Sequence, residues 1–97
     1  MAAGDAYIVG LTSTANNASL TIQPGASVEV VVHNLHIPEG SAWELYRTDG
    51  TNPIKIDHDA ATGRYNLQLH ATNAQYYTLK NVSGSTIYLA VDGMITK

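Results

Sequence analysis

Apolar and polar side chains alternate along much of the chain. Apolar residues fall at every second position of residues 64–70 and again of residues 86–92. Residues 28–32 read Val-Glu-Val-Val-Val, a β-branched run that favours a strand over a helix. This period of two is typical of half-buried strands, and no window of eleven residues carries a clean helical stripe. The pattern therefore predicts β-structure throughout.

Turn signals divide the chain at short intervals, with Gly, Pro, Asn and Asp clustered between the apolar runs. The segments between them predict eight strands, at about 5–12, 18–23, 27–35, 42–48, 54–58, 64–70, 75–81 and 86–92. Many short strands separated by regular turns indicate an all-β fold, an antiparallel β-sandwich of jelly-roll type. Length fits a single domain over residues 1–97, with 1–4 as a short N-terminal tail.

The same alternation predicts which side chains form the core. Ten residues are expected to be mostly buried: Ile22, Val30, Val32, Leu45, Ile56, Leu67, Leu69, Leu79, Leu89 and Val91. Trp43 shares a strand face with Leu45, which favours the core, while a sugar-stacking platform or an interface anchor is the alternative. Strand 27–35 is predicted to be apolar on both faces, with Leu35 on the face opposite Val30.

Apolar surface beyond the needs of a thin sandwich indicates a contact with another protein. Val28 and Val31 lie in the strand that is apolar on both faces, and Tyr76 and Tyr77 form an aromatic pair. These four residues are the predicted interface, with Tyr46 and Tyr88 as further aromatic surface.

The composition narrows the range of partners. Charged residues make up 13% of the chain and the net charge is −3, against about 25% charged residues in ordinary soluble domains. The five basic residues are scattered, so nucleic acid is not an expected partner. The chain has no cysteine, which excludes disulfides and Cys-based metal sites. Neither a signal peptide nor a long apolar span is evident, so we expect cytosolic synthesis and no membrane contact.

Two ionisable clusters are candidates for a chemical site. His33 and His36 stand three residues apart, so on a regular strand their imidazoles diverge. Asp57 and Asp59 offer too few oxygens for calcium, and the simpler interpretation is that their carboxylates bond the amides of the following turn. No nucleophile elbow or phosphate loop is present. The expectation is a protein that is not an enzyme, with no metal and no cofactor.

Several segments together resemble a known group of proteins. They are Leu20–Pro24, Val28–Leu35, Glu44–Asn52, Leu79–Gly84 and Val91–Lys97. In this order they resemble small all-β virion proteins of tailed bacteriophages, over most of residues 18–97. The resemblance implies a structural protein of the virion and carries over no site residue.

The expected function is therefore structural. A capsid decoration or cement protein would bind the major capsid protein on the virion surface and self-associate, most simply as a trimer, after synthesis in the bacterial cytoplasm. The alternative is a carbohydrate- or receptor-binding β-sandwich module of a phage fibre or spike.

Overall fold

The computed structural model describes residues 2–97 and contains eight strands. Their bounds are β1 Ala6–Thr14, β2 Ser19–Ile22, β3 Glu29–His36, β4 Trp43–Thr48, β5 Pro53–Asp59, β6 Leu69–Thr72, β7 Tyr76–Asn81 and β8 Ile87–Ile95. Seven of the eight expected strands are found near their predicted places. The all-β prediction is confirmed.

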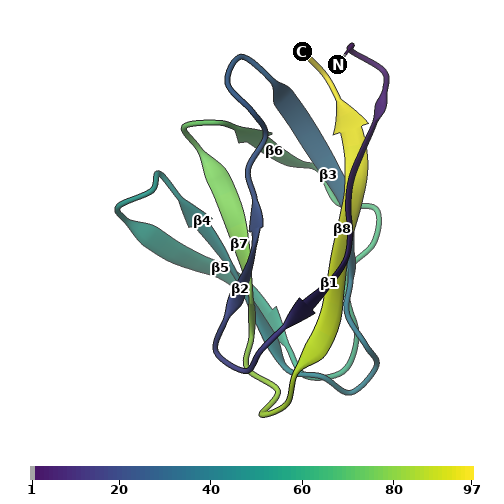
Figure 1. Ribbon diagram of the computed structural model, residues 1–97, viewed down its shortest axis with the longest axis vertical. Helices are drawn as coiled ribbons and strands as arrows, with labels where there is room; N and C mark the ends of the chain where they lie inside the picture. Colours follow the sequence, from purple (N-terminus) through teal and green to yellow (C-terminus); the bar gives the residue numbers. More distant parts are fainter. Residues whose placement is uncertain (1) are drawn as a thin grey trace.

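The strands form two antiparallel sheets that face each other (Figure 1). Sheet A has the order β1-β8-β3-β6 and sheet B the order β2-β7-β4-β5. Only β4 and β5 are consecutive strands within one sheet, among the strands described; every other connection crosses between the sheets. This order is that of a double-sheet jelly roll, so the predicted sandwich of jelly-roll type is confirmed.

The two sheets enclose one apolar core, because each strand turns alternate side chains inward. Trp43 is fully buried there, and so are Leu89 and Val91 of the central strand β8. Seven of the ten predicted core residues are buried: Ile22, Val30, Val32, Leu45, Leu79, Leu89 and Val91. Trp43 lies in the core as predicted, which rules out its alternative role as an exposed platform.

A bulge in β3 corrects the prediction for Leu35. The pairing of β3 with β8 shifts between Val32 and Asn34, with His33 as the extra residue. A bulge moves all later side chains to the opposite face. Leu35 therefore points into the core, on the same face as Val30, and is fully buried.

The predicted strand 64–70 is wrong over most of its length. Strand β6 begins only at Leu69, and Asn66 has a positive φ of 59°, which a strand cannot accommodate. The preceding segment is held against β3 instead, by reciprocal backbone hydrogen bonds between Arg64 and Leu35. Tyr65 is consequently 54% exposed, while Leu67 and Leu69 are only partly buried against the core.

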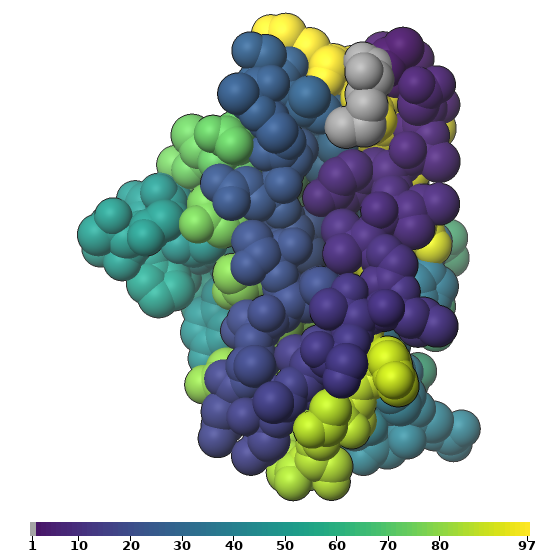
Figure 2. All heavy atoms as spheres, viewed as in Figure 1, coloured from purple at the N-terminus to yellow at the C-terminus, as the bar shows by residue number. Residues whose placement is uncertain are grey.

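Ile56 is also misplaced by the prediction, since it is 45% exposed. The pairing of β4 with β5 shifts between Leu45 and Tyr46, so Asp57 stands opposite the buried Leu45 and Ile56 is the extra residue of a bulge. Strand β5 is also an outer strand of sheet B, and the β4–β5 hairpin projects from the body of the molecule (Figure 2). The bulge therefore removes Ile56 from the inward-facing positions that the alternation predicts.

The N-terminal segment is hydrogen-bonded to strand β8 of sheet A. Gly4 N–H donates to the carbonyl of Ile95 and Asp5 N–H to that of Ala2. The predicted tail 1–4 thus includes a bonded turn, with Met1 outside the described residues. Both ends of the chain lie at the same end of the molecule (Figure 1).

Candidate functional site

An open depression on the outer face of sheet A gathers exposed aromatic and apolar side chains. Its volume is about 350 Å³, and it is shallow and wide open to solvent. We call it the tyrosine depression, and its lining residues are Leu11, His36, Ile37, Pro38, Tyr65 and Tyr88. They come from four parts of the chain that only the folded jelly roll brings together.

Local irregularities place the most exposed of these side chains. The pairing of β1 with β8 shifts between Val9 and Thr12, which leaves Leu11 in a bulge with 77% exposure. Tyr88 alternates with the buried Leu89 on β8, so it faces outward and is 60% exposed. Large apolar side chains gathered at such exposure typically mark a binding surface.

A hydrogen-bonded network fixes the wall formed by His36. The imidazole Nε2 of His36 lies 2.7 Å from one carboxylate oxygen of Asp92, and Asn34 Nδ2 donates to the other oxygen at 2.6 Å. Asn34 in turn accepts a hydrogen bond from the backbone N–H of Asn66. The ring of Tyr65 meets that of His36 edge-on, with centroids 5.8 Å apart. The network thus connects β3, β8 and the segment that carries Tyr65.

Because of these bonds, the fold loses stability as the pH falls into the acid range. Hydrogen bonding to His36, and then to Asn34, lowers the pKa of Asp92 below its ordinary value of 3.8. A carboxyl whose pKa is lower in the folded chain stabilises the fold above its unfolded pKa, and this contribution disappears as the pH falls through the folded pKa. The effect is modest, because 37% of the side chain is exposed and solvent weakens the interaction.

We therefore expect Asp92→Asn to be less stable than the parent at neutral pH. The difference should begin to shrink once the pH falls below 3.8, the ordinary pKa of this carboxyl, and should disappear below the lower pKa of the folded chain, where the folded parent has lost the same charge. Urea unfolding of both proteins across this range measures it. A difference that stays constant with pH would show that the charge of Asp92 has no part in it.

Arg64 secures the other side of the segment that carries Tyr65. Its guanidinium bonds Asp57 at 3.1 Å and Asp59 at 2.6 Å, and it lies over the ring of Trp43. Trp43 Nε1 donates to the carbonyl of Thr62. The segment is thereby attached to β5 and to the core, which gives Tyr65 a defined position.

The two ionisable clusters of the sequence have structural partners. Asp59 accepts hydrogen bonds from the amides of Ala60 and Ala61, as the turn interpretation predicted, while its ion pair with Arg64 was not foreseen. The hydrogen bond that Arg64 donates to Asp59 is the main reason why the pKa of Asp59 is lowered, and the hydrogen bond from the Ala60 amide adds to it. His33 Nδ1 contacts the carbonyl of Leu67, whereas His36 contacts Asp92. Within residues 2–97, no three His, Asp or Glu side chains group as metal ligands would.

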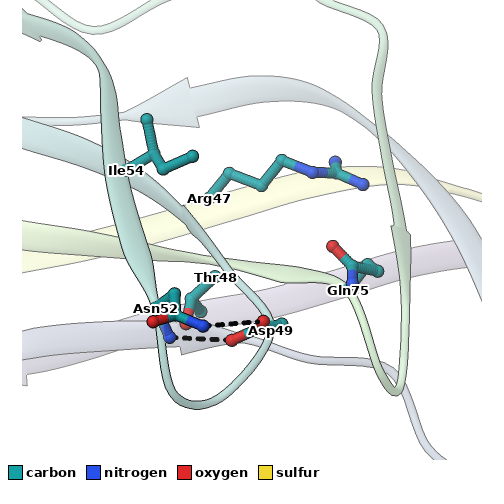
Figure 3. Close-up of a pocket in the computed structure, with 6 residues that line it drawn as sticks. All are labelled: Arg47, Thr48, Asp49, Asn52, Ile54 and Gln75. Atoms are coloured by element: carbon teal, nitrogen blue, oxygen red, sulfur yellow. Dashed lines mark hydrogen bonds between the residues drawn. The ribbon is translucent and has the colours of Figure 1, made fainter.

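A smaller hollow of about 140 Å³ lies beside the β4–β5 turn (Figure 3). Asp49 accepts hydrogen bonds from the backbone N–H groups of Thr51 and Asn52 and from the Asn52 side chain. These bonds lower the pKa of Asp49, and the bond from the backbone N–H of Asn52 has the largest effect. Arg47 lines the same hollow but donates to the hydroxyl of Tyr77. The polar groups here close a turn, so we assign the hollow a structural role.

The four predicted interface residues do not share a face. Val28 is half-buried against the core, and Val31 is half-buried on the outer face of sheet A, opposite Met94. Tyr76 belongs to sheet B, where its neighbour Tyr77 is only 4% exposed. Tyr77 therefore offers little surface to a partner. The proposal that these residues contact another protein stays a prediction.

Sequence reasoning missed most of the tyrosine depression. The sequence pattern predicts Tyr88 as aromatic surface and treats His36 only as a possible metal ligand. It assigns no site role to Tyr65 or Leu11. The glycine at position 10 and Asn66, both of which favour irregular backbone, were the available signals.

Comparison with known protein families and with curated proteins finds no match to this chain. Within the described residues, no helix is long and apolar enough to cross a membrane. The class of protein rests on the fold and on its exposed surface. It is an all-β jelly roll whose sheet A presents an aromatic depression to the outside.

Proposed function

We propose that this protein is a structural component of a phage virion, a capsid decoration or cement protein that docks on the major capsid protein through the tyrosine depression. The observation that carries the proposal is the exposure of Leu11, Tyr65 and Tyr88, at 77%, 54% and 60%, around one concave surface. Tyrosine is enriched at protein interfaces, where its ring is buried and its hydroxyl finds a partner. The role requires no catalytic residue and no cofactor.

The fold supports this proposal at the level of analogy. Jelly rolls with eight strands are found in viral capsid and lectin domains. A fold alone does not determine a function, so the analogy adds weight without deciding between a capsid role and a sugar-binding role.

Composition and resemblance favour the capsid role. The chain is poor in charge and free of cysteine, which suits a protein made in bacterial cytoplasm and attached to a particle mainly by apolar contacts. The segments that resemble phage virion proteins extend through most of residues 18–97. On this proposal the protein resides on the outer surface of the capsid.

The docking surface is testable by removing its two aromatic rings. Added to particles that lack the protein, the double variant Tyr65→Ser, Tyr88→Ser should bind at least about tenfold more weakly, because buried aromatic anchors often contribute 2 kcal/mol or more. Its melting temperature should change little, since both side chains are more than half exposed. Ile54→Ser is the matched control, because Ile54 is 64% exposed, lies on sheet B and does not line the depression.

A high-salt wash distinguishes docking by apolar contacts from docking by charge. An interface of apolar contacts should survive a high-salt wash of the particles, because there are few charges to screen. Equal binding by the double variant and the parent would contradict the proposed surface. Release of the parent protein by salt would contradict the apolar mechanism.

A second candidate function rests on the same depression. Tyrosine rings beside hydrogen-bonding groups such as His36 also suit a sugar, which would make the protein a carbohydrate- or receptor-binding module of a fibre or spike. A glycan array distinguishes the two, since a decoration protein should show no sugar preference. Copy number per particle is a second test, with hundreds expected for decoration and tens for a fibre tip.

A further inference from the structure

The four outer strands of the two sheets differ in how well they are protected against pairing with another chain. An outer strand exposes unpaired backbone N–H and C=O groups, and proteins block such edges with short strands, proline, charged residues or bulges. Strands β2 and β6 have four residues each. Strand β5 carries Pro53, Lys55, Asp57 and Asp59, and it contains a bulge.

Strand β1 has little of this protection. It has nine residues, Ala-Tyr-Ile-Val-Gly-Leu-Thr-Ser-Thr, with no charged side chain and no proline. Its only irregularity is the bulge between Val9 and Thr12. Six of its nine residues are exposed, and Ile8 is 68% exposed. In Figure 2 the strand runs along the visible surface of the molecule.

We propose that β1 pairs in antiparallel fashion with β1 of a second copy, so that sheet A continues across a two-fold axis as one eight-stranded sheet. The pairing is centred on Ile8. This proposal concerns the free protein and does not depend on docking to a capsid.

The hydrogen bonds of the strand define that centre. The N–H of Ile95 donates to the carbonyl of Asp5, so the carbonyl of Asp5 points toward β8. Antiparallel pairs alternate, so Tyr7 and Val9 also direct their backbone groups to β8. Ile8, opposite Asp92, then directs its N–H and C=O to the open edge.

The side chains are self-complementary about Ile8. A two-fold axis at this residue places Ile8 opposite Ile8 of the second copy, and Tyr7 opposite Val9. No like charges meet, because the strand has none, and apolar cross-strand pairs stabilise a sheet. On the outer face, the direct neighbour of Ile8 on β8 is Asp92, while Met94, which is 46% exposed and pairs with Val31, lies two residues further along β8.

The symmetry of this contact bears on the size of the oligomer. A contact that uses the same strand from both copies is isologous and closes as a dimer, whereas a trimer ring requires two different surfaces. The other outer strands are short or blocked. The β1 edge therefore favours a dimer over the trimer that the sequence suggested.

Cysteine cross-linking tests the register directly, because the chain has no cysteine of its own. Opposed residues of an antiparallel pair have Cα atoms about 4.5–5.5 Å apart, within the range of a disulfide. Ile8→Cys should form a covalent dimer on mild oxidation. Ala6→Cys, on the same strand and also exposed, should not, since its own counterpart lies about four residues away, or roughly 13 Å.

Sedimentation of charge variants tests the edge independently. Ile8→Lys should raise the dimer dissociation constant at least about tenfold, because it opposes two lysines at the two-fold axis. Ile54→Lys is the control, on a different outer strand with a similar exposure of 64%. A parent protein that is monomeric at 100 µM, a scale at which micromolar dimers would be seen, would overturn the proposal. So would cross-linking through Ala6→Cys but not Ile8→Cys, or equal dissociation by the two lysine variants.

Discussion

Replacing Trp43 by alanine is expected to lower the free energy of unfolding by about 3–5 kcal/mol. The indole is fully buried between the sheets, and its removal both loses burial and leaves a cavity. The change also removes the hydrogen bond from the indole to the carbonyl of Thr62, and this lost bond adds to the loss. A domain of this size has about 5–15 kcal/mol of stability, so much of it would be lost.

Urea unfolding followed by far-ultraviolet circular dichroism measures this effect without relying on the only tryptophan. Tyr65→Ala is the control, because Tyr65 is 54% exposed and surface changes usually stay within about 0.5 kcal/mol. Trp43→Phe should fall between the two, since it keeps a ring in the core but not the bond to Thr62. A loss below about 1 kcal/mol for Trp43→Ala would contradict a core position, on the same scale for buried aromatic residues.

The period of two in the sequence was sufficient for the fold class and most of the core. It predicts Val30 and Val32 correctly because the first half of β3 is regular. The same rule fails at Leu35, where one extra residue at His33 reverses the face. A single-residue bulge has no strong signature in one sequence, since pairing between strands creates it. Errors in face assignment therefore begin at bulges.

Ile56 repeats this limit, because it is the extra residue of the bulge in β5. Leu67 and Leu69, predicted for the core but only partly buried, show a second limit. They follow an apolar alternation, yet the chain is bent at Asn66 and strand β6 begins only at Leu69. Alternation tells which side chains share a face but not whether another layer covers that face. The strand order supplies this information, and it is a tertiary property.

The candidate site could not be predicted from the sequence, because it too depends on the tertiary arrangement of the strands. Tyr88 and Leu11 approach each other because β1 pairs with β8, while Tyr65 arrives from a segment that Arg64 attaches to β5. No local motif connects these positions. Exposure is what distinguishes them from core residues of the same type, and exposure depends on the finished fold.

Replacing Gly93 by alanine should be as damaging as the loss of a large core residue, although it adds only one methyl group. Gly93 lies in the central strand β8, between Tyr7 of β1 and Val32 of β3. A Cβ at this position would stand 2.0 Å from the carbonyl oxygen of Val31 and 2.8 Å from the Cα of Val32. Both are backbone atoms of the neighbouring strand, so no side-chain rotation relieves the overlap.

The strands must separate to admit the methyl group, and this breaks the ladder that joins the two halves of sheet A. We expect Gly93→Ala to cost about 3 kcal/mol or more, at the upper end of the range for overpacked cores. Gly25→Ala is the matched control: its Cβ meets nothing within 4 Å, so the change should be neutral or stabilise by about 0.4–1 kcal/mol through the unfolded chain. Urea midpoints for the two variants measure the contrast. If Gly93→Ala proves as stable as Gly25→Ala, the close approach of β8 to β3 at the bulge is wrong, and with it the reversed face that buries Leu35.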